Sequence, residues 1–122
     1  MSWHFDNQRP LYLQLVEQLK ARIISGDYPP GGRLPSVREL ATQTGVNPNT
    51  LQRAFAQLEQ EGLLYTERTT GRFVTDDAAR LAQLKEEAVL RLADQFLAQA
   101  GLLGYNPTAA AQLLTQRSEI YA

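Results

Sequence analysis

The sequence of 122 residues contains no cysteine and a single histidine, His4. The absence of cysteine excludes a disulfide framework and a thiol nucleophile. Zinc and copper sites need several histidine or cysteine ligands, so His4 by itself does not indicate a metal site. It is also the one candidate base for Ser-His-Asp catalysis, and it lies near the N-terminal end. We therefore expect neither an enzyme nor a cofactor.

Long hydrophobic runs are missing as well. No stretch approaches the roughly 18 apolar residues that cross a bilayer. Residues 1–6 lack the basic and apolar regions of a secretory signal. Hydrophobic residues make up 43% of the sequence and charged residues 20%, which is typical of a soluble globular protein. The length fits one compact domain, or a small domain with an appendage, and we expect a cytoplasmic protein.

The net charge of −1 argues at first against a nucleic-acid partner. The charges are unevenly spread, because residues 1–75 carry eight basic and seven acidic residues and residues 76–122 carry four and six. Affinity for nucleic acid depends on which basic groups reach phosphates rather than on their total number. The basic residues closest to the motifs described next are Arg33, Arg38, Arg53 and Arg72.

Two helices are predicted in the first third of the chain. Residues 10–25 carry apolar side chains at helical spacing. Ser36 and Glu39 have the spacing of a capping box, which starts a short helix over Val37–Thr44. Gly45 can adopt the left-handed conformation that ends this helix.

A third helix begins at Asn47 and Pro48, because asparagine is a good N-cap and proline favours the first helical position. It ends at Gly62. Its apolar side chains fall on one face, namely Leu51, Ala54, Phe55 and Leu58. The opposite face carries Asn49, Arg53, Ala56 and Gln60.

Short β-prone runs follow the third helix. Leu63–Thr66 and Arg72–Thr75 predict two strands, and residues 67–71 predict the tip of the hairpin between them. Earlier in the chain, residues 27–32 are rich in proline and glycine and predict a turn.

The second and third helices have the pattern of a DNA-binding helix-turn-helix. Ala41 lies four residues before Gly45, where a small side chain lets two helices cross closely. The third helix then opens with small polar residues and Arg53, which is typical of a recognition helix. The apolar contacts on both sides of the turn would come from Leu40, Val46, Leu51 and Ala54.

Residues 76–122 predict two more helices, one to about residue 101 and one beginning at Asn106 and Pro107. Apolar residues alternate at spacings of three and four, as at a helix–helix seam. We expect these helices to pair with a second copy of the chain in an isologous contact. The predicted dimerisation residues are Leu81, Leu84, Ala88, Val89, Leu92, Ala93, Phe96, Leu103, Leu113 and Leu114.

Several blocks in fixed order resemble the GntR family of winged-helix transcription regulators. They are Pro10-Leu11-Tyr12, Gln14-Leu15, Gly26-Asp27-Tyr28, Leu34-Pro35-Ser36-Val37-Arg38-Glu39-Leu40-Ala41, Gly45-Val46-Asn47-Pro48-Asn49-Thr50 and Leu58-Glu59-Gln60-Glu61-Gly62. The resemblance covers residues 10–75. The Asn-Pro-Asn-Thr start of the third helix and the short C-terminal part look like the YtrA subfamily, which carries two helices after the wing.

The resemblance implies DNA contacts for particular side chains. Arg38 matches an arginine that contacts the DNA backbone or a guanine, and Ser36 matches a phosphate contact. At the wing, Gly71 matches a glycine that enters the minor groove and Arg68 a basic residue beside it. Thr69 departs from the family's Arg-Gly-x-Gly pattern, and Arg72 could supply a compensating phosphate contact. The recognition-helix positions that the resemblance implies are Asn49, Thr50, Gln52 and Arg53, and we add Arg33 and Asn47 to the predicted interface.

The sequence thus predicts a mostly α protein: a winged helix-turn-helix over residues 1–75, with three helices and a β-hairpin wing, and a two-helix dimerisation region over residues 76–122. The predicted function is a transcription regulator, a repressor, that binds an inverted-repeat operator in double-stranded DNA as a homodimer. The alternative is a winged helix that binds a protein instead. Ser36 could be only a helix cap, Arg38 could pair with an acid, and Gln52 and Arg53 could be solvated surface residues. Residues 76–122 contain no cluster of polar groups that specifies a small-molecule effector.

Overall fold

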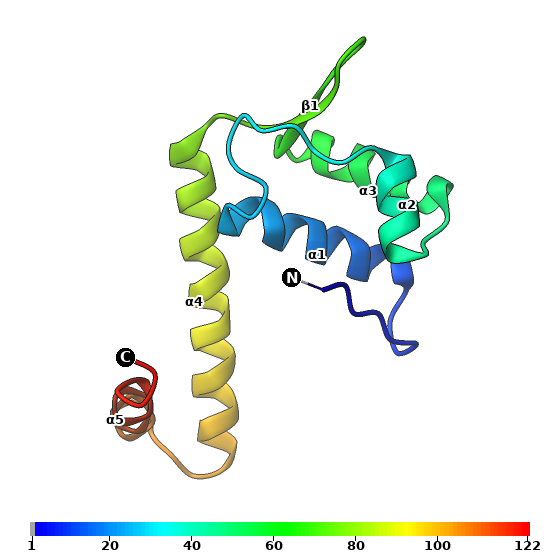
Figure 1. The fold of residues 1–122 in the computed structure, drawn as a ribbon. Coiled ribbons are helices and arrows are strands. Elements are labelled where there is room, and N and C mark those ends of the chain that lie inside the picture. Colours follow the sequence, from blue (N-terminus) through cyan, green and yellow to red (C-terminus); the bar gives the residue numbers. More distant parts are fainter. Residues whose placement is uncertain (1) are drawn as a thin grey trace. The chain divides into compact units, whose positions relative to one another are not determined.

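The computed structural model describes residues 2–122 and divides into two compact units, with the boundary between Gln83 and Leu84. The N-terminal unit holds three helices and a β-hairpin, and two further helices follow (Figure 1). The expected mostly helical winged helix-turn-helix with two C-terminal helices is confirmed. The elements are α1 (Leu11–Ser25), α2 (Val37–Thr44), α3 (Pro48–Gln60), β1 (Leu64–Glu67), β2 (Gly71–Val74), α4 (Ala78–Leu102) and α5 (Pro107–Ser118).

The helix ends in the N-terminal unit are fixed by the predicted capping residues. At the start of α2, Ser36 Oγ accepts a hydrogen bond from the Glu39 amide at 3.1 Å, and the Glu39 carboxylate accepts one from the Ser36 amide at 3.3 Å. Gly45 ends α2 with a φ of 73°, and Asn47 caps α3 by accepting from the Asn49 amide at 2.8 Å. These local contacts set the three-residue turn between the two helices.

The hydrophobic core lies between α1, α2, α3 and the hairpin. Burying each large apolar side chain stabilises the fold by about 1.5–3 kcal/mol. Lys20 on α1 and Glu61 at the end of α3 form an ion pair of 2.8 Å at the margin of this core. The fully buried large side chains are Leu15, Leu19, Ile23, Leu40, Leu51, Phe55, Leu58, Leu63 and Val74.

Strands β1 and β2 pair antiparallel, and Leu64 lies opposite Val74 and Glu67 opposite Gly71. The hairpin projects away from α1, α2 and α3 (Figure 1). Both strands lie one residue closer to the turn than predicted, and the turn consists of residues 68–70. Gly71 is therefore the first residue of β2, not the tip of the wing as the sequence suggested.

Residues 32–34, at the end of the turn that the sequence predicted over residues 27–32, run along the free edge of β2. The Leu34 amide donates to the Arg72 carbonyl at 2.8 Å, and the Val74 amide donates to the Gly32 carbonyl at 2.9 Å. Arg33 forms a bridge with Phe73 between these bonds. This pairing places Arg33 at the base of the wing, which periodicity alone did not predict.

The chain before α1 lies along that helix and runs in the opposite direction. Gln14 bonds the backbone of Asp6, and Gln18 bonds the backbone of His4. Arg22 donates to the Ser2 carbonyl at 3.3 Å. Two extended residues span about 6.7 Å and four helical residues about 6 Å. Every second residue before α1 can therefore meet every fourth residue of that helix. We call residues 2–9 the N-terminal arm.

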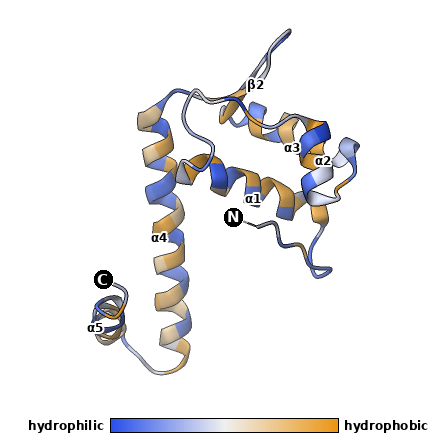
Figure 2. Cartoon of the chain, in the orientation of Figure 1, coloured by the Kyte–Doolittle hydropathy of each residue, from blue (hydrophilic) through white to orange (hydrophobic). Residues whose placement is uncertain are grey.

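The second unit contains most of α4 together with α5. Asn106 caps α5 by accepting from the Ala109 amide at 2.8 Å, as Asn106 and Pro107 predicted. Hydrophobic and hydrophilic residues alternate along α4, and many of the hydrophobic ones face solvent (Figure 2). Among the described residues, no helix is both long and apolar enough to cross a membrane.

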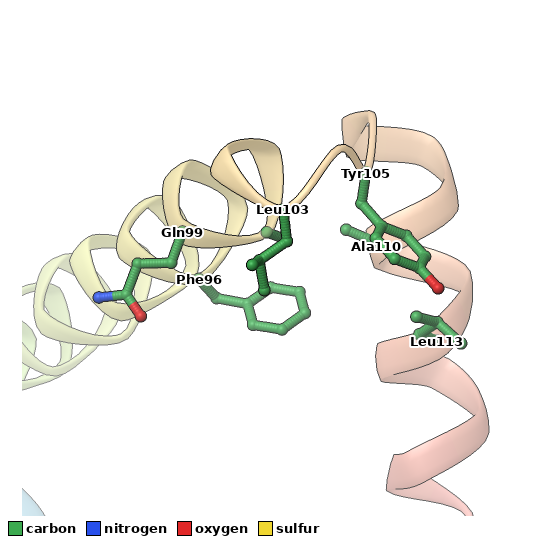
Figure 3. Close-up of a pocket in the computed structure, with 7 residues that line it drawn as sticks. Phe96, Gln99, Leu103, Tyr105, Ala110 and Leu113 are labelled. Atoms are coloured by element: carbon green, nitrogen blue, oxygen red, sulfur yellow. The ribbon is translucent and has the colours of Figure 1, made fainter.

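An open apolar hollow of about 290 Å³ lies between the end of α4 and α5 (Figure 3). Phe96 and Leu103 point into it from one side, and Tyr105 and Leu113 line the other. Ala110 is the buried residue of α5, with 1% of its surface exposed. The apolar side chains of this unit therefore lie around an open hollow rather than in a closed core.

Candidate nucleic-acid interface

Helices α2 and α3 present a buried side to the core and an exposed side to solvent. The four predicted contacts of the helix-turn-helix, Leu40, Val46, Leu51 and Ala54, are all buried. The opposite side of α3 is exposed at every position that the helical period indicated, namely Asn49, Arg53, Ala56 and Gln60. Helix α3 is 13 residues long, and the major groove of DNA is wide enough to admit an α-helix.

The N-terminal turn of α3 carries hydrogen-bond donors. Asn47 uses its Oδ1 atom for the cap, which leaves its side-chain amino group as a donor. Asn49 is exposed and Thr50 half-buried at the next positions. The positive end of the helix dipole lies in the same turn, so this end of α3 favours a negatively charged partner.

Arg53 is held against α1. Its guanidinium carbon lies 4.0 Å from the ring centre of Tyr12, which is a cation–π distance. The Tyr12 hydroxyl donates to Gln57 Oε1 at 3.4 Å. Stacking uses the face of the guanidinium and leaves its N–H groups at the edge free to donate.

A hydrogen bond joins the recognition helix to the second strand of the wing. Arg72 Nη2 on β2 donates to Gln52 Oε1 on α3 at 2.7 Å. The same guanidinium lies 4.8 Å from the ring centre of Phe55, a fully buried side chain. Gln52 is exposed and Arg72 is half-buried. The two predicted DNA-binding residues therefore form a single unit.

The start of α2 presents two more predicted residues. Ser36 is exposed and accepts its capping bond through Oγ, so its O–H group remains able to donate to a phosphate. Arg38 is exposed in the first turn, and its side chain has no hydrogen bond or ion pair within residues 2–122. The alternative in which Arg38 pairs with an acidic neighbour is not what the structure holds.

The wing carries Arg68 in its exposed turn, where Thr70 bonds Glu67. Gly71 has a φ of 115°, a conformation that side chains rarely adopt. A Cβ atom placed on Gly71 would lie 3.2 Å from Arg33 Nε. The glycine is thus needed by the backbone of the wing and by the close approach of Arg33, independently of any DNA.

Glu61 and Tyr28 of the N-terminal unit have shifted pKa values. The hydrogen bond from Lys20 lowers the pKa of Glu61, and Gln57 adds to the effect. Burial raises the pKa of the Tyr28 hydroxyl. No cluster of three His, Asp or Glu side chains that could hold a metal ion occurs in the part of the chain that the structure describes.

Comparison with known proteins identifies the family. The family model described as "Bacterial regulatory proteins, gntR family" matches residues 11–74, more than half of the sequence. The chain belongs to the GntR family. It is therefore a DNA-binding transcription regulator and not an enzyme, and this finding also sets aside a winged helix that binds only protein.

Two Bacillus subtilis proteins are similar to this GntR regulator. The HTH-type transcriptional regulator YhcF is 38% identical over 104 residues, 85% of this chain and 86% of YhcF. The HTH-type transcriptional repressor YtrA is 38% identical over 84 residues, 64% of this chain and 65% of YtrA. The match to YtrA agrees with the resemblance to its subfamily.

Solved structures agree with the same assignment. A GntR family transcriptional regulator from Listeria monocytogenes superposes with a TM-score of 0.85 at 38% identity, covering 92% of this chain and 98% of that one. The DNA-binding domain of AraR in complex with operator ORR3 gives a TM-score of 0.54 at 32% identity, covering 59% of this chain and 87% of that one.

Sequence reasoning missed three contributors to this surface. Tyr12 and Phe55 hold the two arginines, and they were assigned only to a helix and to the core. Both contacts join different elements of the fold, Tyr12 of α1 with Arg53 of α3 and Phe55 of α3 with Arg72 of β2. They depend on tertiary packing, so the sequence pattern did not predict them. The Gly32–Leu34 edge carried no periodic pattern that could have predicted its pairing with β2.

Proposed function

We propose that this GntR regulator is a cytoplasmic repressor that binds an inverted-repeat operator as a homodimer. The observation that carries the proposal is a set of exposed and half-buried polar and basic residues at the start of α2, on the outer face of α3 and on the wing. We call this set the DNA face. Its residues are Arg33, Ser36, Arg38, Asn47, Asn49, Thr50, Gln52, Arg53, Arg68, Gly71 and Arg72.

Roles on the DNA face divide by chemistry. Arg38 and Arg53 are charged and exposed, and we assign them to phosphates or to guanine. Gln52 and Asn49 are neutral and lie on the outer face of α3, and we assign them to base edges in the major groove. Arg68 lies in the turn of the wing and would contact the neighbouring groove or its backbone. The AraR domain, whose solved structure contains an operator, supports this use of the fold.

The homodimer is supported by exposed apolar side chains in the second unit. Val89 is 58% exposed, Leu92 62% and Leu103 83%. Contiguous apolar surface of this kind marks a protein interface. The same surface on two copies forms an isologous contact with two-fold symmetry, which matches an inverted repeat. The proposed dimerisation region is residues 76–122 without Leu81, which is 5% exposed and already covered by its own chain.

Repression would follow from occupancy. A dimer bound at a promoter excludes the polymerase from the same DNA. The relative YtrA is named as a repressor, which supports this sign of regulation. No reaction is involved, so the affinity for the operator and the dimer equilibrium set the output.

One experiment tests dimerisation and DNA binding together. Val89→Glu places a charge on the side of α4 that carries Val89, Ala93 and Phe96. The control, Ala98→Glu, adds the same charge at an exposed position on the opposite side of that helix. Sedimentation at micromolar concentration should give a dimer for the wild-type and Ala98→Glu proteins and a monomer for Val89→Glu. Binding to a duplex selected from a random library should weaken for Val89→Glu alone.

The result also separates the two parts of the proposal. A monomeric wild-type protein would overturn the dimer. A dimer whose affinity for every duplex is insensitive to salt would overturn DNA binding through phosphates, because release of counterions makes such binding weaken steeply with salt. Full removal of residues 76–122 is a poorer test, because it also removes the buried Leu81.

A further inference from the structure

Both the backbone and the side chain of Arg72 are held by neighbouring residues. Its backbone carbonyl accepts from the Leu34 amide at 2.8 Å, and its strand position lies opposite Thr66. Its guanidinium lies over the ring of Phe55, which has no exposed surface. Gln52, by contrast, is an exposed side chain on α3, and its one side-chain hydrogen bond within residues 2–122 is the bond with Arg72. In the bond between the two residues, Arg72 is therefore the fixed partner and Gln52 the one that is positioned.

This bond fixes which end of the Gln52 amide faces outward. A guanidinium only donates hydrogen bonds, so the amide atom that faces Arg72 Nη2 must be the oxygen Oε1. The amide nitrogen, with its two N–H groups, then remains for another partner. It donates to no group among residues 2–122. Gln52 consequently presents donors on the DNA face.

The edges of the bases differ in what they offer to such a group. Guanine presents two acceptors in the major groove, N7 and O6. Adenine presents the acceptor N7 beside the donor N6, and the usual glutamine–adenine pair uses both the amide nitrogen and the amide oxygen. In this chain Arg72 takes one of the two lone pairs of that oxygen and holds the oxygen toward β2. Gln52 held in this way offers its N–H groups to a base, which matches the two acceptors of guanine better than the acceptor and donor of adenine.

We propose that Arg72 is a specificity-determining residue that positions Gln52 to select guanine over adenine at one base pair of each half-site. The inference rests on the proposed function, since it requires that Gln52 faces a base edge. In this proposal a residue of the wing influences which base the recognition helix selects. Arg72 acts through Gln52 and does not itself contact that base.

The experiment uses the full-length protein and a duplex library randomised over about two helical turns. The base pair that Gln52 contacts is identified as the position at which Gln52→Ala loses its preference. Two duplexes that differ only there, G·C or A·T, then compete for each protein. The wild-type protein should favour the G·C duplex by about fivefold or more.

Two variants change the donor chemistry. Arg72→Met keeps an apolar stem over Phe55 but frees Oε1, so the ratio of G·C to A·T binding should fall to about one or reverse. Gln52→Glu replaces the donors by a carboxylate that only accepts, so the guanine preference should disappear while Arg72 is retained. Both readouts are ratios, so a general loss of affinity in either variant cancels.

The outcomes distinguish the inference from the proposed function. If Gln52→Ala relaxes no position, the proposed base contact is overturned. If it relaxes a position at which the wild-type protein prefers adenine, the contact stands and the role of Arg72 is overturned. An unchanged guanine preference in Arg72→Met would overturn that role as well. Arg72→Leu, which also frees Oε1, gives the same test should Arg72→Met fail to fold.

Discussion

Arg53 of α3 lies over the ring of Tyr12 of α1, with the guanidinium carbon 4.0 Å from the ring centre. An arginine side chain loses much rotational freedom when it binds a phosphate, because it has four flexible torsions. The stack on Tyr12 removes part of that freedom before DNA arrives. A core-packing helix thereby contributes to the DNA face through a residue that would not touch DNA itself.

Replacing Tyr12 should weaken DNA binding through Arg53. Tyr12→Leu removes the ring, and an exposed cation–π contact contributes about 0.5–1 kcal/mol, so the Kd should rise by roughly two- to fivefold. Tyr12→Phe keeps the ring and loses only the long hydrogen bond to Gln57, and it should bind as the wild-type protein does. Fluorescence anisotropy at fixed salt measures both.

The coupling to Arg53 has its own control. In an Arg53→Ala background, Tyr12→Leu should cause no further loss of affinity, because the stack is already absent. Equal losses in the two backgrounds would show that Tyr12 acts through the fold instead. An unchanged Kd in Tyr12→Leu would contradict the prediction outright.

Gly71 should be required for stability as much as for DNA binding. Its φ of 115° lies outside the left-handed region near 57° that asparagine tolerates, so Gly71→Asn and Gly71→Ala should both be strained. The expected loss is about 1–3 kcal/mol in the free energy of unfolding, measured by urea denaturation. Adding Arg33→Ala to Gly71→Ala removes the Nε atom that lies 3.2 Å from the new Cβ but not the backbone strain. The double variant should therefore recover little of the lost stability. Wild-type stability in Gly71→Ala would contradict this account.

The N-terminal arm should depend on Gln14. This side chain is 3% exposed and makes three bonds to the arm, from the Asp6 amide at 2.9 Å, to the Asp6 carbonyl at 2.9 Å and to the Arg9 carbonyl at 2.8 Å. Gln14→Ala leaves these groups without partners and should lower the free energy of unfolding by about 1–3 kcal/mol. Hydrogen exchange at the Asp6 amide should speed up.

Gln18→Ala is the matched control for the arm. Gln18 makes the same kind of bonds to His4, but the contact is exposed, so water can replace it at smaller cost. A Gln14→Ala protein with unchanged stability and exchange would show that the arm is held by its other contacts, such as that of Arg22 with Trp3 at 3.6 Å.

The features that followed from the sequence are the local ones. Ser36 with Glu39, Gly45, and Asn47 with Pro48 determine helix ends through neighbours a few residues away. Their spacing predicted both ends of α2 and the start of α3, whereas α3 ends at Gln60, two residues before the predicted Gly62. The outer face of α3 followed from the helical period in the same way. Residue type and family resemblance supplied the residues proposed for the DNA face, and their contacts with DNA stay a prediction.

The features that did not follow depend on tertiary pairing. Arg33 lies at the base of the wing because the Gly32–Leu34 backbone pairs with β2, and no periodic pattern marks that pairing. The bond between Arg72 and Gln52 joins residues that are 20 positions apart. The strand ends shifted by one residue because the turn takes three residues, which leaves Gly71 inside β2.

The ion pair of Lys20 and Glu61 predicts a pH dependence of stability. Lys20 Nζ donates to Glu61 Oε1 at 2.8 Å, and this bond lowers the pKa of the Glu61 carboxyl in the folded protein. The pair is therefore at full strength above the ordinary glutamate pKa of about 4.3 and is lost as the pH falls through the lower folded value. Lys20→Met should remove this part of the acid dependence. Both side chains are about 30% exposed, so the effect should stay below about 1 kcal/mol.

Other carboxylates titrate in the same range, so the measurement must be a difference. Glu17, whose pKa is lowered by the hydrogen bond from Arg9, contributes equally to the wild-type protein and to Lys20→Met. The difference in free energy of unfolding between the two proteins should hold a constant value from pH 7 to about pH 5 and shrink below the ordinary glutamate pKa. Glu61→Gln should give a difference from the wild-type protein with the same shape. A difference that stays constant down to pH 3 would mean that Lys20 stabilises α1 and α3 through its aliphatic stem rather than through the carboxylate of Glu61.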